Sequence, residues 1–440
     1  MEAVANSVED VLIDALSFKL SNSASYLTDR KSVTFWPSGS NIYKTNSGTK
    51  VIRFVLTNDN WIDPSTVRVM FNLVNNDSDA SKMLRTISGP HAFFRRIRIM
   101  CQGSLIEDFD YNRTHEMFQV LTSAHNREND DIENFGYRAD TVQPNGSHTT
   151  STLPGIAGGS YQTVGMKLCS GILNQPKMLP LKYMPLTIEL ELVNGANDPV
   201  VEPGVDSTFT TSNTSNDWQL ENVQLKCDIC NLDNSLQNNY DSHLLSGKSL
   251  PINFNTYITQ SQAITGQDVS VSLNRAITRL KSIFVTFFQS TDTDATHKEF
   301  NDFNHPMDNA TGLKYDSDYE IEYQIQIGSK LFPEYPVKSI SEAFAQLKKT
   351  LGIIGSNFHS TSVSPLQYRT DHFIIGTDTE KALQAGFTGL NTRQGDLLSI
   401  KVKAVSKSVL TSAKMPDTMY VVLHSDQIME ISDQGVQVFD

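Results

Sequence analysis

The stretch Leu186-Thr187-Ile188-Glu189-Leu190-Glu191-Leu192 places an aliphatic side chain at every second position and a polar one between. A period of two is typical of a β-strand with one buried and one exposed face. The same alternation recurs in both halves of the chain, at residues 51–56, 67–73, 97–99, 223–229, 283–287, 321–327, 398–405 and 419–423. We therefore expect an all-β protein.

Two short segments have helical periodicity instead, and each follows a Gly-Ser pair. A Glu-x-Phe-x-x-Leu pattern occupies residues 116–121 after Gly103-Ser104, and the same pattern occupies 342–347 after Gly328-Ser329. The offset between the copies is 225 residues at the Gly-Ser pair and 226 residues at the Glu-x-Phe pattern. A nearly constant offset indicates an internal repeat. We expect one short helix in each copy, near residues 113–124 and 339–351.

The length of the chain also favours two structural units. A chain of 440 residues exceeds what one sandwich core needs and suits two domains of roughly 200 residues each. Residues 195–217 are rich in Asn, Pro, Ser, Thr and Gly, a composition typical of a linker or exposed loop. The expected division is an N-terminal arm at 1–30, a first sandwich at 31–216 and a second at 217–440.

Composition excludes several classes of protein. No apolar run reaches the roughly 18 to 20 residues of a membrane-spanning helix. The 36 Lys and Arg against 49 Asp and Glu give a net charge of −13, which disfavours a nucleic-acid coat and sequence-specific nucleic-acid binding. Glu9, Asp10 and Asp14 interrupt the region where a secretory signal has its apolar segment, so we expect synthesis without such a signal.

Two motifs invite a chemical interpretation that their context does not favour. Cys227-Asp228-Ile229-Cys230 is a CxxC motif without a second ligand pair, and Cys227 falls on the apolar face of a predicted strand. Arg95, Arg96 and Arg98 stand beside two phenylalanines. We interpret the cysteine as an ordinary strand residue, and the arginines as partners of carboxylates at the edge of a strand at subunit contacts, in preference to a nucleic-acid surface.

An acidic cluster offers the oxygen ligands that a hard cation prefers. It comprises His125, Glu128, Asp130, Asp131 and Glu133. The spacing lacks the glycine turn of an EF-hand loop, so we favour a solvated helix end or loop and expect no metal site. A cation at a subunit contact is the remaining functional alternative.

The N-terminal arm carries its own helical pattern. Ser7 and Asp10 are arranged like a helix-capping pair, and Val8, Leu12 and Leu16 repeat every four residues. The polar stretch that follows predicts a flexible tether. We expect an arm helix whose apolar stripe needs a partner outside its own sandwich: a neighbouring subunit, another protein of the same assembly or, least favoured, an internal membrane. The alternative is a helix packed on its own sandwich.

Three blocks of the sequence resemble one protein family. They are Ile106-Glu107-Asp108-Phe109-x-Tyr111-Asn112-Arg113-x-His115-Glu116-Met117-Phe118, Leu179-Pro180-Leu181-x-x-Met184-Pro185-Leu186-x-Ile188-Glu189-Leu190-Glu191-Leu192, and Tyr240-x-x-His243-Leu244-Leu245-Ser246-Gly247-Lys248-Ser249-Leu250-Pro251-Ile252. In content and order they are similar to blocks in the major capsid proteins of polinton-like viruses, adintoviruses and Maverick/Polinton elements. The resemblance extends from about residue 30 to residues 428–431.

That resemblance implies a double jelly roll, two tandem eight-stranded jelly-roll β-sandwiches, which trimerises into a pseudo-hexagonal capsomer and tiles an icosahedral shell. It implies a location in the virion capsid and partners that are further copies of the chain and minor capsid or penton proteins. Residues 141–160 and 290–318 are then expected as loops that project outward. A shell protein of this kind needs no catalytic residue and no cofactor, and we expect none.

Two other functions fit an all-β chain of this composition. A receptor- or carbohydrate-binding spike or fibre protein of a virion would not need two matched sandwiches. A β-sandwich hydrolase would use a pair of carboxylates whose pKa values differ. No G-x-S-x-G, H-E-x-x-H or P-loop motif is present in the sequence, which disfavours the hydrolase.

Overall fold

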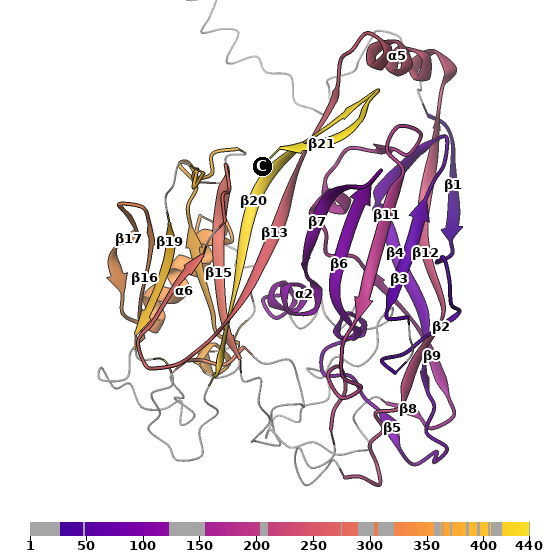
Figure 1. Ribbon diagram of the computed structural model, residues 1–440. Helices are drawn as coiled ribbons and strands as arrows, with labels where there is room; N and C mark the ends of the chain where they lie inside the picture. The colour runs from indigo at the N-terminus through magenta and orange to yellow at the C-terminus, as the bar shows by residue number, and fades with distance from the viewer. Residues whose placement is uncertain are drawn as a thin grey trace, which may run out of the picture.

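The fold is taken from a computed structural model, which describes residues 27–46, 49–122, 155–202, 210–273, 275–288, 303–306, 321–355, 365–369, 372–383, 387–393, 397–403 and 416–439, with the single positions 361, 363 and 405. Two β-sandwiches stand side by side, and strands far apart in sequence lie next to each other in each (Figure 1).

The first sandwich has two sheets. One has the order β1 (Leu27–Phe35), β12 (Trp218–Leu232), β4 (Trp61–Asn75) and β10 (Leu179–Pro180), with β2 (Ile42–Tyr43) on β12 and β9 (Tyr161–Lys167) on β4. The other has the order β3 (Val51–Leu56), β11 (Leu186–Leu192), β6 (Phe94–Cys101) and β7 (Ser104–Asp110). A two-stranded ribbon of β5 (Met83–Leu84) and β8 (Ile156–Ala157) lies at one end.

The second sandwich repeats this arrangement. Its first sheet has the order β13 (Leu250–Ala263), β20 (Thr418–Ser432), β15 (Leu280–Phe288) and β18 (Ile374–Asp378), with β21 (Gly435–Phe439) on β20. Its other sheet has the order β14 (Val269–Leu273), β19 (Leu398–Lys403), β16 (Glu322–Ile327) and β17 (Lys330–Val337). In chain order, the eight strands β1, β3, β4, β6, β7, β9, β11 and β12 of the first sandwich match β13 to β20 of the second one to one, as the internal repeat predicts.

The two expected helices lie at equivalent places. A hairpin turning at Gly103 (φ +88°) joins β6 to β7, and α2 (Tyr111–Gln119) follows. A hairpin turning at Gly328 (φ +59°) joins β16 to β17, and α6 (Ile340–Thr350) follows. Both turns need the left-handed backbone that glycine adopts without strain. The Ser339 hydroxyl caps α6 by accepting the Glu342 N–H at 3.1 Å.

The expected division at residues 216 and 217 is wrong. The strand that begins at Trp218 pairs with β1 and β4, so β12 completes the first sandwich. Residues 195–217 therefore connect β11 to β12 inside that sandwich, and α5 (Asn234–Leu245) leads from β12 to the second. The arm boundary also shifts, because β1 begins at Leu27, within the expected arm.

The alternating stretch at 186–192 is the inner strand of its sheet, between β3 and β6. Leu186, Ile188, Leu190 and Leu192 are fully buried in the first core, and the polar positions between them face outward. Most of the buried apolar residues form two large clusters, one in each sandwich. The two-core expectation is thereby met.

One loop expectation needs correction. Most of residues 290–318 lies outside the described residues, but Phe303, Asn304 and His305 do not project outward: their exposed fractions are 0%, 4% and 2%. Phe303 belongs to the second core and bridges to His372, and its backbone oxygen accepts the Phe373 N–H at 2.8 Å. An aromatic residue within a polar segment can be drawn into a nearby core because its burial is strongly favourable.

Candidate assembly surfaces

Helix α2 lies in the junction between the two sandwiches (Figure 1). It is held to the first sandwich by Glu116, whose carboxylate lies 2.7 Å from His91 Nε2 of the short helix η2 (Pro90–Phe93) in a fully buried pair. Met117 of the helix, and Val120 and Leu121 just after it, belong to the core of the second sandwich. A single helix therefore belongs to both cores.

Aromatic side chains fill the contact between α2 and the second sandwich. The Phe118 ring lies 5.4 Å from the Tyr257 ring on β13 and 5.7 Å from the Phe284 ring on β15. The guanidinium of Arg113 stacks over the Phe288 ring at 3.6 Å. Aromatic and cation–π contacts of this kind add to the stabilisation from buried area. The outer face of the β13-β20-β15 sheet is thus covered by an element of the first sandwich.

Glu107 on β7 is buried in the same junction. Its carboxylate accepts hydrogen bonds from the Ser170 hydroxyl and from the N–H groups of Gly171 at 2.9 Å and Ile172 at 3.4 Å, at the start of α4 (Gly171–Asn174). Burial raises the pKa of Glu107 to about 7, although these bonds and one from Thr256 on β13 oppose the rise. One buried carboxylate connects β7, α4 and the second sandwich.

The end of the second sandwich nearest α5 packs into the first core. Ile252, Phe254, Met429, Ile431 and Val436 from β13, β20 and β21 belong to the apolar cluster of the first sandwich. The backbones approach closely there, since a Cβ at position 171 would lie 1.3 Å from the carbonyl oxygen of residue 255. Close apolar packing along the whole junction joins the sandwiches into one body.

His424 on β20 faces this junction and has a lowered pKa. Its ring stacks on Tyr257, with ring centroids 5.2 Å apart, and its Nδ1 lies 3.1 Å from the Ser282 hydroxyl. Burial lowers the pKa of His424 to about 3, because a charged imidazolium would lose its hydration there. The side chain is neutral at physiological pH.

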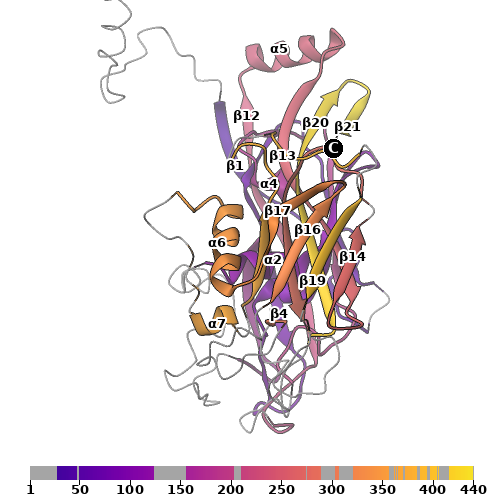
Figure 2. The ribbon, with the colours of Figure 1, turned by 90° about the vertical axis from the view of Figure 1, so that its left-hand side faces the viewer.

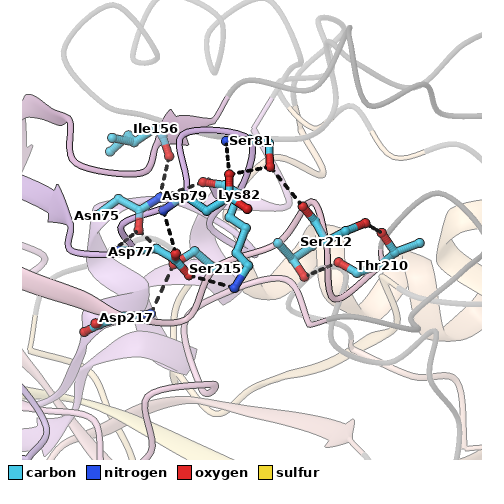
Figure 3. A network of polar contacts seen from close by, with 11 residues as sticks. Asn75, Asp77, Asp79, Ser81, Lys82, Ile156, Thr210, Ser212, Ser215 and Asp217 are labelled. Atoms are coloured by element: carbon cyan, nitrogen blue, oxygen red, sulfur yellow. Dashed lines mark hydrogen bonds and ion pairs between the residues drawn. The ribbon is translucent and has the colours of Figure 1, made fainter.

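Buried Asn75 organises the loops at the end of the first sandwich that carries β5 and β8 (Figure 3). Its amide donates to the carbonyls of Lys82 at 3.0 Å and Ile156 at 2.8 Å, and its side-chain oxygen accepts from Asp77 N–H and the Ser215 hydroxyl. Three loops are thereby fixed to the end of β4. The segment 155–160, part of an expected outward loop, is anchored rather than free.

The carboxylates beside Asn75 do not form a cation site. Asp77 and Asp79 accept N–H groups of their own loop, and Lys82 Nζ lies 3.2 Å from Asp77. Within the described ranges, no group of three or more His, Cys, Asp or Glu side chains is arranged to hold a metal ion. The cluster from His125 to Glu133 lies outside the described residues, and so do Val8, Leu12 and Leu16.

The three arginines of β6 pair with carboxylates, but inside the chain and not at a strand edge. Strand β6 lies between β11 and β7. Arg96 and Asp108 form a bidentate pair at 2.5 Å, and Arg98 lies 3.3 Å from Glu189. Arg95 lies 3.9 Å from Glu191. The outer face of this sheet is therefore a ladder of neutralised charges, which disfavours a phosphate-binding role for it.

The CxxC cysteines are strand residues. Cys227 is 3% exposed beside Leu225 and Ile229 on the inner face of β12, and Cys230 is fully buried. Burial raises the pKa of Cys227 to about 12, so the thiol is protonated and unreactive. In the described part of the chain no helix is long and apolar enough to cross a membrane.

Among the described residues, one edge strand lies at each flank of the chain. Strand β17 lies at one flank and β1 at the other (Figures 1 and 2). On β17 the side chains of Tyr335 and Leu331 are 63% and 39% exposed, and the first six residues of β1 are exposed. Edges of this kind are candidate contact surfaces.

Solved structures with the same architecture are viral capsid proteins. The PBCV-1 protein VP54, fitted into a reconstruction of the virophage Sputnik, has a TM-score of 0.62 at 12% identity, over 96% of this chain and 100% of that one. The Faustovirus major capsid protein has a TM-score of 0.59 at 7% identity, over 98% and 94%. The fold is a double jelly roll. The mavirus major capsid protein has it too, with a TM-score of 0.52 at 10% identity over 98% and 94%.

The double jelly roll extends over nearly the full length of both chains in each comparison. No protein-family model matches the sequence. No curated protein matches it either. The similarity to these capsid proteins therefore lies in the arrangement of strands and not in the identity of residues.

Sequence reasoning missed the residues that join the sandwiches. Glu107, Phe118 and Tyr257 appear in or near the quoted blocks, but nothing in their spacing assigns them to a junction. No sequence signal marks Glu107, because its burial is visible only in the structure. His424 directly follows the apolar run 419–423.

Proposed function

We propose that this chain is the major capsid protein of an icosahedral virus, and that three copies form a capsomer with six sandwiches around one axis. The observation that carries the proposal is the fusion of two matched jelly rolls into one body by α2, Glu107 and the shared apolar core. The double jelly-roll fold supports it, since the solved structures described above with this arrangement are capsid proteins. The partner of each copy in the capsomer is another copy of the same chain.

The same geometry disfavours the alternatives. A spike or fibre protein has no use for two matched sandwiches in a rigid body. A hydrolase of this class would need paired carboxylates in a cleft. The buried carboxylates of Glu107 and Glu116 are each occupied, by the start of α4 and by His91. We further propose that the virus is of the polinton-like, adintovirus or Maverick/Polinton type, on the strength of the three sequence blocks.

The oligomeric state tests the proposal directly. Light scattering coupled to size-exclusion chromatography should give three times the chain mass of 49.0 kDa, about 147 kDa. A single species at the mass of one chain over the whole accessible concentration range would contradict it.

The N-terminal arm is the proposed contact to neighbouring capsomers or minor capsid proteins. The apolar stripe of Val8, Leu12 and Leu16 supports this, as does its place before β1 at a flank of the chain. Deleting residues 1–21 should leave folding and trimer mass unchanged and impair closure of shells, measured by electron microscopy. A markedly lower melting temperature would instead indicate an arm packed on its own sandwich, and normal closed shells would remove the arm from assembly.

A further inference from the structure

The junction inside the chain is a head-to-tail contact. It joins β7 and α2 of the first sandwich to the outer face of β13, β20 and β15 of the second. The matching surfaces are β17 in the second sandwich and the outer face of β1, β12 and β4 in the first, and they lie at opposite flanks of the chain (Figure 1). Head-to-tail contacts repeat from copy to copy and close into a ring when the rotation permits.

The two open flanks differ in chemistry from the internal junction. On the first sandwich, Lys226 of β12, Arg68 of β4 and Lys167 of β9 are direct cross-strand neighbours, all exposed on the outer face. We call these three residues the basic row. The nearby carboxylates of Asp63 and Asp228 already bind Arg30, at 3.0 and 2.7 Å.

Strand β17 offers complementary groups at the opposite flank. Glu334 and Tyr335 are exposed, and a carboxylate and an aromatic ring are the two groups that attract Lys and Arg side chains. Pro333 and Pro336 remove two N–H donors from this edge, so it cannot extend a foreign sheet by regular pairing. Contact through side chains is what remains.

Helix α6 does not project from its sandwich as α2 does. It lies on β18 of its own sheet, where a Cβ at Gly376 would meet Leu347 at 2.9 Å. In the described part of the chain, α6 therefore offers no counterpart of the aromatic wedge that α2 supplies within the chain.

We propose that the basic row of one copy receives Glu334 and Tyr335 of a second copy, which makes the seam between copies polar while the junction within each copy is apolar. This inference rests on the proposed capsomer and names the surfaces that build it. Screening weakens exposed ionic contacts, so salt should separate the copies under conditions that leave each chain folded.

The test is the double variant Lys226→Glu with Lys167→Glu. Light scattering should show trimers dissociating at least about tenfold more readily than those of the unaltered chain, a change of about 1.4 kcal/mol. The melting temperature of the separated chain should change little, because both lysines are exposed on the outer face. Lys248→Glu, an exposed lysine in the turn between α5 and β13 and outside both surfaces, is the control and should keep the trimer.

A charge exchange completes the experiment. Adding Glu334→Lys to the double variant should restore part of the lost association. Trimers of the double variant with unchanged stability and unchanged salt dependence would overturn the inference, and so would normal trimers that lose binding to heparin, which would assign the row to a polyanion. An unaltered chain that never trimerises would instead refute the proposed capsomer itself.

Discussion

At the scale of single residues, the junction depends on polar groups buried between two apolar cores. The carboxylate of Glu107 can be buried because N–H groups at the start of α4 donate hydrogen bonds to it. His424 is tolerated because it remains neutral. Each group would be costly to bury without its partners or in its charged form.

Replacing Glu107 by Ala should lower the free energy of unfolding by about 3 kcal/mol, because the Ser170 hydroxyl and two N–H groups lose their buried acceptor. Glu107→Gln should cost less, since its amide oxygen still accepts. Urea unfolding measures both. Glu191→Ala, which removes only the 3.9 Å contact with Arg95 at the surface, is the control and should change stability by less than about 0.5 kcal/mol. Equal losses in Glu107→Ala and the control would refute the role of Glu107.

His424 should make the protein less stable in acid. Its pKa is about 3 in the folded chain and about 6.5 when unfolded, so the unfolded state binds the extra proton and stability falls as pH decreases from 6.5 towards 3. The loss at pH 4.5 is on the order of 3 kcal/mol. Glu107 acts oppositely, because its raised pKa of about 7 makes the folded state the stronger proton binder between pH 7 and about 4.5.

The variant His424→Gln isolates the histidine. Glu107 is present in both proteins, so its titration contributes equally to both, and between pH 6.5 and 3 the unaltered chain should lose stability more steeply than the variant. Urea unfolding of both proteins at pH 7.5, 4.5 and 3.5 measures the difference. Parallel pH profiles would show that His424 does not titrate as its burial requires.

At the scale of elements, α2 is the piece that makes two sandwiches behave as one. Its Glu116 side is fixed to the first sandwich and its Phe118 side to the second. Helix α6 lies at the equivalent point of the repeat, yet it packs on β18 of its own sandwich. Equivalent sequence patterns thus produce different packing.

Phe118→Ala should weaken the coupling between the sandwiches. The loss of a largely buried aromatic ring costs about 3 kcal/mol, and calorimetry should show one cooperative transition for the unaltered chain and two for the variant. Phe344→Ala on α6, whose ring meets Tyr368 at 5.0 Å within the second sandwich, should lower the single transition without dividing it. Two transitions already present in the unaltered chain would contradict the coupling.

Sequence patterns predicted the elements better than their partners. Alternation at 186–192 and the Gly-Ser repeats locate strands and helices because these signals are local. The pattern at 223–229 predicts a strand equally well, but pairing is decided by long-range contacts, and so the sandwich to which β12 belongs was misassigned. Phe303 was missed for the same reason, because its polar neighbours carry no sign of the core that receives it.

At the scale of the whole molecule, two jelly rolls joined edge to face give an object that has contact surfaces at both flanks. The internal junction buries aromatic and aliphatic groups, while the flanks present the basic row and β17. A stable monomer with polar flanks suits a protein that must fold before it assembles. We propose that such monomers build an icosahedral capsid shell.

Electron microscopy of the purified or overexpressed protein tests that claim most directly. We expect trimeric particles with a hexagonal outline about 70 to 80 Å across, which is an order-of-magnitude width for six sandwiches at ordinary domain packing. We also expect closed shells tiled from these particles. Isolated monomers, or discrete oligomers without threefold symmetry that never tile, would contradict it.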